Sequence, residues 1–199
     1  QGVDDGVGKV LDYLDQTGLA KNTIVIYSAD NGWYLGDLGL YDKRFMYEES
    51  IRMPVLVRYP PAIKPGSVND AMALNVDFAP TFLDFAGQPT PPEVQGHSLK
   101  PLLAGQTPAD WRKSWYYRYY HYPNEHGTEP HYGVRTERYK LIYFHRINQW
   151  ELFDLRNDPH ELKNIVNDAK NAKLVAELKT ELARLRTQLD DRDQFANQP

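Results

Sequence analysis

The sequence predicts an α/β fold in which a parallel-sheet segment is followed by a small antiparallel sheet with a long packing helix. Three observations carry this prediction. An apolar, β-branched run at residues 23–27 follows a helix-spaced segment, four strand-like stretches lie between residues 114 and 155, and residues 175–189 carry a leucine-rich helical stripe. With 199 residues the chain is long enough to bury a core.

The N-terminal half alternates between helix and strand patterns. Apolar residues recur at helical spacing through residues 3–14, and Gly18 ends that pattern. The run TIVIY at residues 23–27 is typical of a strand covered on both faces in a parallel sheet. The stretch RMPVLVRYP predicts another strand, and VDFAPTFLDFAG predicts a short helix with Asp77 at its N-cap and Gly87 after its end.

The C-terminal half carries the signals of an antiparallel sheet. The stretches SWYYRYYHY, HYGVRT, YKLIYF and WELFDL are rich in strand-forming residues, and Glu137 with Arg138 can form a tight turn between the second and third. Apolar residues spaced three and four apart through residues 175–189 predict a helix that packs on this sheet, or alternatively one that meets a coiled-coil partner. The last residues, 191–199, are expected to fray.

Composition bounds the domain organisation and excludes some partners. The proline- and glycine-rich stretch from Gly87 to Trp111 predicts a surface connection, so we expect one domain over residues 1–108 and a second over residues 109–199. A net charge of -4 argues against nucleic acid as a partner, and no apolar run is long enough to predict a membrane span. Because the chain has no cysteine, these residues form no disulfide and offer no cysteine nucleophile.

The turn after residues 23–27 carries the side chains best suited to chemistry. Asp30 and Asn31 offer neighbouring oxygen atoms of the kind that calcium and magnesium bind, and Gly32 lets the backbone turn sharply. Lys43 follows on the same loop, and a lysine beside a divalent cation can neutralise charge on a phosphoryl or sulfuryl group. The alternative is an ordinary Asp-Asn-Gly turn with a solvated surface lysine nearby.

The string TIVIYSADNG, followed by LGDLGLYDKRFMYEESIRMPVLVRYP, resembles the C-terminal half of the type I sulfatases, members of the alkaline-phosphatase-like superfamily. The resemblance continues through HYGVRTERYKLI and ELFDLRNDPHELKNIV and covers roughly residues 4–170. It is strongest to bacterial sulfatases related to iduronate-2-sulfatase and to mucin-desulfating N-acetylglucosamine-6-sulfatases. The resemblance implies the C-terminal part of a sulfatase fold and the hydrolysis of sulfate monoesters, with sulfated carbohydrates or aryl sulfates as substrates.

The resemblance also implies roles for individual residues. Asp30 and Asn31 correspond to calcium ligands, and Lys43 corresponds to the lysine that contacts the sulfate group. His131 lies in a region that borders the substrate pocket in such sulfatases, where it either contacts the sugar or is an ordinary strand or loop histidine. Leu38 stands where the family pattern often has a histidine, so any polar role at that position is lost or moved.

Type I sulfatases use a formylglycine made from a Cys/Ser-X-Pro-X-Arg motif, and no such motif occurs in these residues. We therefore expect formylglycine and further calcium ligands to come from a missing N-terminal part. This chain alone should be inactive and should not bind calcium tightly, since calcium takes about six to eight oxygen ligands. The strand at residues 23–27 would be left uncovered, which would favour self-association.

The alternative functions are those of a phosphonate monoester hydrolase or phosphodiesterase of the same superfamily, and of a non-catalytic binding module. A periplasmic or secreted location would fit the family.

Overall fold

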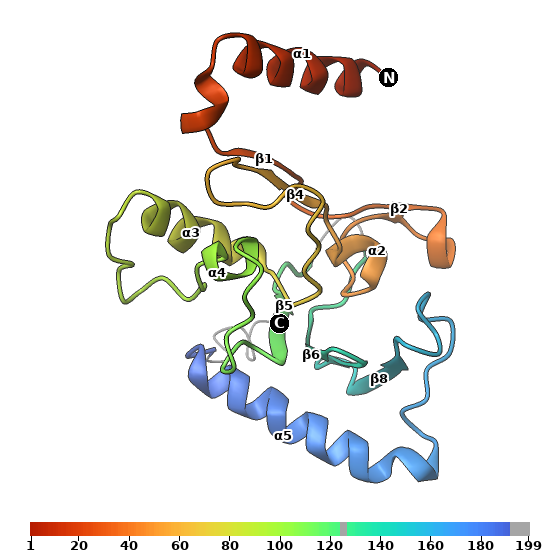
Figure 1. Cartoon of the computed structure of the whole chain (residues 1–199). Coiled ribbons are helices and arrows are strands. Elements are labelled where there is room, and N and C mark those ends of the chain that lie inside the picture. Colours follow the sequence, from red (N-terminus) through yellow and green to blue (C-terminus); the bar gives the residue numbers. More distant parts are fainter. Residues whose placement is uncertain (124–126, 192–199) are drawn as a thin grey trace. The chain divides into compact units, whose positions relative to one another are not determined.

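The computed structural model describes residues 1–123 and 127–191 of the chain (Figure 1). Of the segment that we expect to fray, residues 191–199, all but residue 191 lie outside the described part. Among the described residues, no helix combines the length and the apolar character needed to cross a membrane.

The chain divides into two compact units, which are residues 1–30 with 53–111, and residues 31–52 with 112–199. The predicted domain division after residue 108 stays a prediction. Within the chain, however, the loop of residues 31–52 groups with the C-terminal sheet, because its side chains form part of the core on that sheet.

The first unit contains helices and two strands, as the alternating patterns predict. Its elements are α1 (Gly2–Gln16), the 3₁₀ turn η1 (Leu19–Asn22), β1 (Val25–Ser28), β4 (Val55–Arg58), the 3₁₀ turn η3 (Asn75–Asp77), α3 (Phe78–Phe85) and α4 (Lys100–Leu103). Helix α1 ends at Gln16, and Gly18 follows in the left-handed region with a φ of 71°. The predicted first helix and its glycine stop are therefore confirmed.

The two strands of this unit pair with each other in antiparallel fashion. Val25 on β1 lies opposite Arg58 on β4, and Ser28 lies opposite Val55. The parallel pairing that we expected for this segment is therefore not the pairing that the chain itself forms. An apolar β-branched run indicates cover on both faces of a strand, but it carries no information about the direction of the neighbouring strand.

Helix α3 begins after Asp77, which occupies the predicted N-cap position. Its carboxylate nevertheless accepts hydrogen bonds from two backbone amides outside the helix, that of Leu74 at 2.8 Å and that of His97 at 2.9 Å. Asp77 is fully buried, so this side chain fastens the segment around His97 to the start of α3. Close approach explains Gly96, where a Cβ atom would lie 2.0 Å from the carbonyl oxygen of Val76.

The second unit is built around the predicted antiparallel sheet. Its elements are β2 (Tyr34–Leu35), the 3₁₀ turn η2 (Asp37–Gly39), β3 (Tyr41–Asp42), α2 (Glu48–Ile51), β5 (Ser114–Tyr119), β6 (His131–Thr136), β7 (Tyr139–Phe144), β8 (Gln149–Asp154), the 3₁₀ turn η4 (Ala169–Asn171) and α5 (Ala172–Gln188). Strands β5 to β8 form one sheet in sequence order. Arg135 lies opposite Lys140, which confirms the two-residue turn at Glu137 and Arg138.

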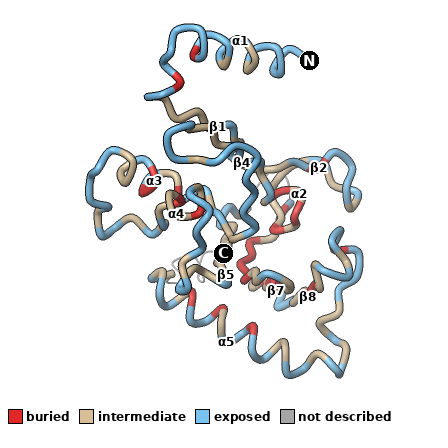
Figure 2. Tube along the Cα trace, viewed as in Figure 1, coloured by how far each residue is buried: buried red, intermediate tan, exposed pale blue. Residues whose placement is uncertain are grey.

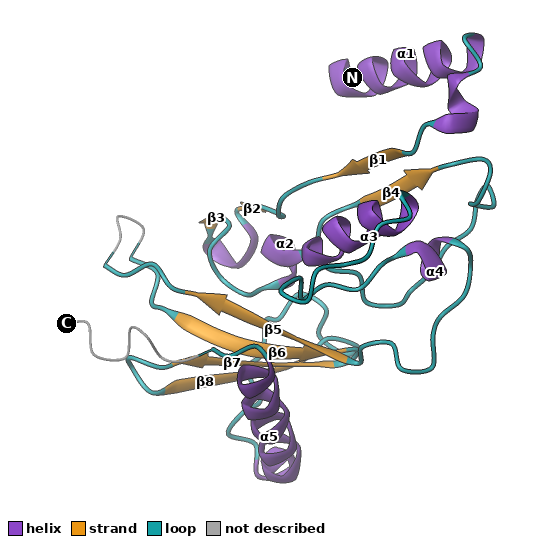
Figure 3. Cartoon of the chain, turned by 90° about the vertical axis from the view of Figure 1, so that its left-hand side faces the viewer, coloured by secondary structure: helices purple, strands orange, loops and turns teal. Residues whose placement is uncertain are grey.

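Helix α5 runs across one face of this sheet (Figure 3). Its buried leucines pack on buried residues of the strands; the cluster contains Tyr132, Val134, Leu141, Leu152, Leu178, Leu182 and Leu185. Figure 2 shows buried positions along one side of α5. The packing of the long helix on the sheet is confirmed. The leucine stripe is buried against the sheet of the same unit, as in the first of the two predicted alternatives.

The loop of residues 31–52 covers further apolar residues of the sheet. Met46 is fully buried and clusters with Ile142, Phe144 and Phe153. The contact is close, because a Cβ atom on Gly133 of β6 would lie 2.6 Å from the Met46 sulfur. The loop that carries Lys43 is therefore anchored by core packing and is not a free surface loop.

Candidate functional site

The turn after β1 is held in place by the short helix α2. The amide of Gly32 donates to the carbonyl oxygen of Ser50 at 2.7 Å, and the Asn31 side-chain nitrogen donates to the carbonyl oxygen of Gly32 at 2.6 Å. Asp30 directly precedes this turn and is exposed. Glycine is required at position 32, since a Cβ atom there would lie 1.9 Å from the carbonyl oxygen of Glu49.

Lys43 follows β3 on the same loop and is half-buried. The Ser50 hydroxyl donates to its carbonyl oxygen at 2.6 Å, and its ammonium nitrogen lies 5.4 Å from the centre of the Trp33 ring. The Tyr34 hydroxyl donates to the carbonyl oxygen of Phe45 at 3.1 Å, which holds the other side of the lysine. The backbone around Lys43 is thus fixed at two points.

Ser50 joins the two halves of the predicted site. This buried serine accepts from Gly32 through its carbonyl and donates to Lys43 through its hydroxyl, so the Asn31 turn and the lysine are tied to one residue. Sequence reasoning missed Ser50, because a serine in a short helix carries no local signal of such a contact. Asp30 is assigned to the first unit, whereas Asn31 begins the stretch of residues 31–52 in the second unit.

Leu38 lies at the turn of the hairpin between β2 and β3, where it takes the left-handed conformation with a φ of 55°. A residue with a Cβ atom pays about 1–2 kcal/mol for that conformation. Leu38 offers no polar side-chain atom. A side-chain hydrogen bond at this turn comes instead from Asp37, whose carboxylate accepts from the amide of Leu35 at 3.0 Å.

His131, the predicted sugar contact, is fully buried at the start of β6. Its ring stacks with Phe45, Tyr117 and Tyr119, and its Nδ1 lies 2.8 Å from the carbonyl oxygen of Glu129. Burial lowers the pKa of His131 to about 4, so the ring is neutral at pH 7. This environment favours the alternative interpretation, a structural strand histidine.

Asp30 and Asn31 offer the hard oxygen donors that calcium prefers. Because the amide nitrogen of Asn31 donates to the Gly32 carbonyl, its amide oxygen is the end suited to a cation. The donor types therefore fit calcium, but two residues supply too few ligands for a complete shell. Within residues 1–123 and 127–191, no three His, Asp or Glu side chains gather as a metal site.

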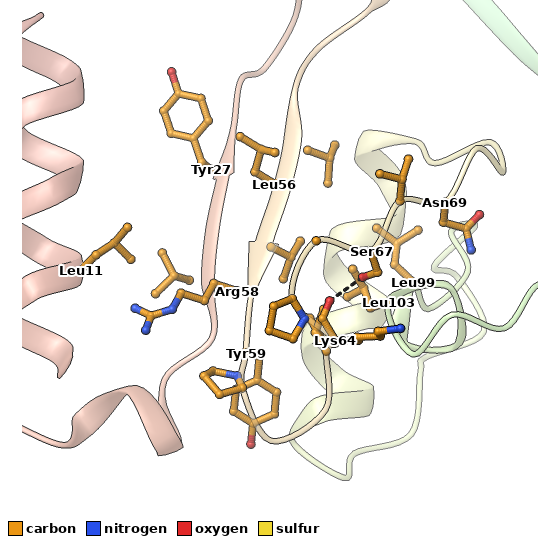
Figure 4. Close-up of a pocket in the computed structure, with 18 of the residues that line it drawn as sticks. Leu11, Tyr27, Leu56, Arg58, Tyr59, Lys64, Ser67, Asn69, Leu99 and Leu103 are labelled. Atoms are coloured by element: carbon orange, nitrogen blue, oxygen red, sulfur yellow. Dashed lines mark hydrogen bonds between the residues drawn. The ribbon is translucent and has the colours of Figure 1, made fainter.

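The first unit has a large cavity of about 1150 Å³ between α1, the strand pair and the segment after β4 (Figure 4). Its lining is mainly apolar and includes Leu11, Tyr27, Leu56 and Leu99, and none of the predicted site residues lines it. Leu56 is 65% exposed. The predicted self-association concerns this surface and stays a prediction.

Replacing Gly32 by alanine is expected to lower the free energy of unfolding by about 1–3 kcal/mol, because the added methyl group would overlap the Glu49 carbonyl oxygen. Gly8→Ala in α1 is the matched control, since a Cβ atom there meets nothing within 4 Å. Urea denaturation of the parent and both variants measures the effect. Equal stability of Gly32→Ala and the parent would contradict the crowding seen at this turn.

Residues 36–188 match the N-sulphoglucosamine sulphohydrolase C-terminal family. The chain belongs to this family. It is 52% identical over 194 residues to an N-acetylglucosamine-6-O-sulfatase of Bacteroides thetaiotaomicron, a match that covers 96% of this chain and 35% of that protein. The resemblance to the C-terminal portion of type I sulfatases is confirmed.

Solved structures of similar proteins confirm the fold. One, a complex with its substrate D-glucosamine-2-N,6-O-disulfate, matches with a TM-score of 0.92 and 51% identity, covering 96% of this chain and 39% of that chain. A phosphonate monoester hydrolase from Silicibacter pomeroyi matches with a TM-score of 0.84 and 31% identity, covering 94% of this chain and 39% of that chain. The family member described here thus spans little more than a third of the length of these relatives.

Proposed function

We propose that the whole protein to which these residues belong hydrolyses sulfate monoesters of sugars. The observation that carries this proposal is the 52% identity to an N-acetylglucosamine-6-O-sulfatase over almost the entire chain. The loop geometry supports it, because Asn31 and Lys43 are tied to the same residue, Ser50. A 6-O-sulfated amino sugar is the substrate class that we propose, and an aryl sulfate is a convenient assay substrate.

Asp30, Asn31 and Lys43 each have a chemical role in this proposal. Asp30 and Asn31 contribute oxygen ligands to a calcium ion, which would stabilise negative charge on the sulfate oxygens. The Lys43 ammonium binds the same sulfate group, and it favours the transition state by neutralising charge that develops there. A formylglycine from a Cys/Ser-X-Pro-X-Arg motif elsewhere in the protein would supply the nucleophile. We propose that the chain alone is inactive.

The test is the kinetics of Lys43→Ala in the whole protein. We expect kcat/KM for a sulfate ester to fall about 10²- to 10³-fold, as for the loss of one group that stabilises transition-state charge. Lys173→Ala is the control, because this lysine on α5 is 91% exposed and its change should leave kcat/KM unaltered. Parent-like activity of Lys43→Ala would rule out the assigned role.

A second candidate activity is the hydrolysis of phosphonate monoesters, since a phosphonate monoester hydrolase shares the fold at 31% identity. Sulfate and phosphonate esters both present tetrahedral oxyanions to a cation and a lysine. The ratio of kcat/KM values for an aryl sulfate and a phenylphosphonate ester separates the two. Preference for the phosphonate would replace the sulfatase proposal.

A further inference from the structure

We propose that an ion cluster of the buried residues Glu48, Lys140 and Glu161 with the partly buried Arg135 is a positioning device for Lys43. The cluster holds α2 on the sheet, and α2 in turn holds the backbone of the lysine. The inference rests on the proposed function, because the cluster would affect hydrolysis only through the lysine that binds sulfate.

Lys140 lies at the centre of the cluster and is fully buried on β7. Its ammonium nitrogen is 2.8 Å from Glu48 Oε1 and 2.7 Å from Glu161 Oε1. The second oxygen of Glu161 accepts from the backbone amide of Glu48 at 2.7 Å. One lysine and one glutamate thus hold both the side chain and the backbone of Glu48 at the first residue of α2.

Arg135 completes the cluster from the neighbouring strand β6. Its Nε and Nη2 atoms donate to the two carboxylate oxygens of Glu48 at 3.3 Å and 3.1 Å. Such a two-pronged contact fixes the plane of the carboxylate as well as its position. Burial raises the pKa of Glu48, but Lys140 and Arg135 together lower it by more, so the net shift is downward and the carboxylate stays ionised at pH 7.

One hydrogen bond joins α2 to the backbone of Lys43, and a second fixes the next residue to the sheet. Ser50, two residues after Glu48, donates through its hydroxyl to the Lys43 carbonyl at 2.6 Å. The Tyr117 hydroxyl on β5 donates to the carbonyl of the next residue, Arg44, at 3.2 Å. A buried ion pair adds little net stability over apolar packing. Instead, these charges fix the orientation of α2 on the sheet. Through the Ser50 hydrogen bond, α2 then fixes the backbone position of Lys43.

The experiment uses the paired substitution Lys140→Met with Glu161→Gln in the whole protein. This pair removes one charge of each sign, and the glutamine oxygen can still accept from the Glu48 amide. We expect kcat/KM for a sulfate ester to fall about 10- to 100-fold, the cost of misplacing a reacting group by roughly an ångström. The matched control is Lys173→Met with Glu177→Gln, an exposed pair on α5 for which no loss is expected.

Adding Lys43→Ala to the paired variant separates positioning from general damage. If the cluster acts through Lys43, the paired substitution should cost nothing further once the lysine is gone. Losses that multiply, or parent-like kcat/KM of the paired variant, would overturn the inference while leaving the proposed function intact. Parent-like activity of Lys43→Ala alone would overturn both.

Should the paired variant fail to fold, Glu161→Gln alone provides the test. This variant keeps the ion pair between Lys140 and Glu48 and removes only the ion pair between Lys140 and Glu161. We therefore expect a smaller loss of kcat/KM, about three- to tenfold. This loss should also vanish on the Lys43→Ala background. A loss of equal size on both backgrounds would overturn the inference.

Discussion

Replacing Lys140 by methionine should lower the free energy of unfolding by about 3–5 kcal/mol, because it leaves a buried carboxylate without its cation. Glu161 loses the ammonium at 2.7 Å, whereas Glu48 keeps Arg135. Urea denaturation at pH 7 measures the loss. A change below about 1 kcal/mol would show that Lys140 does not hold this charge in place.

Two controls identify the charge as the cause. The paired variant Lys140→Met with Glu161→Gln should recover most of the lost stability, since no uncompensated carboxylate remains. Burial raises the pKa of Glu161, so the penalty in Lys140→Met should also shrink as pH falls and this carboxyl takes up a proton. A penalty that persists in the paired variant would point to lost packing of the lysine stem instead.

Acidification from pH 7 to pH 4 should cost about 3 kcal/mol of stability through His131 alone. Burial lowers the pKa of this histidine from 6.5 to about 4 in the folded state. Its contribution is therefore complete above pH 6.5, the value in the unfolded chain, and is lost as pH falls toward 4. Between these pH values the His131 side chain binds a proton more readily in the unfolded chain than in the folded chain, which favours unfolding.

The comparison of His131→Phe with the parent isolates this effect. Phenylalanine keeps a ring among Phe45, Tyr117 and Tyr119 but cannot titrate, so the difference in stability between pH 7 and pH 4 should shrink by about 3 kcal/mol. His160→Phe is the control, because the His160 side chain is 74% exposed. An identical pH dependence in His131→Phe and the parent would contradict the assignment.

The candidate site shows where sequence reasoning stops. Asp30, Asn31 and Lys43 follow from residue chemistry and from the resemblance to sulfatases, but no pattern identifies Ser50 as the residue that links the turn to the lysine. The sugar contact of His131 stays a prediction. A histidine beside tyrosines has the same local pattern whether it contacts a ligand or belongs to the core, and its stacking and full burial in the structure favour the core interpretation.

The sequence by itself determined the local elements of this protein. Helix α5, the turn at Glu137 and Arg138, and the start of α3 after Asp77 lie where they were predicted, because periodicity and turn chemistry act over a few residues. Tertiary structure alone decided the antiparallel pairing of β1 with β4 and the ion cluster. Glu48 and Glu161 are 113 residues apart, and such contacts depend on how strands and loops pack in space, which local patterns do not record.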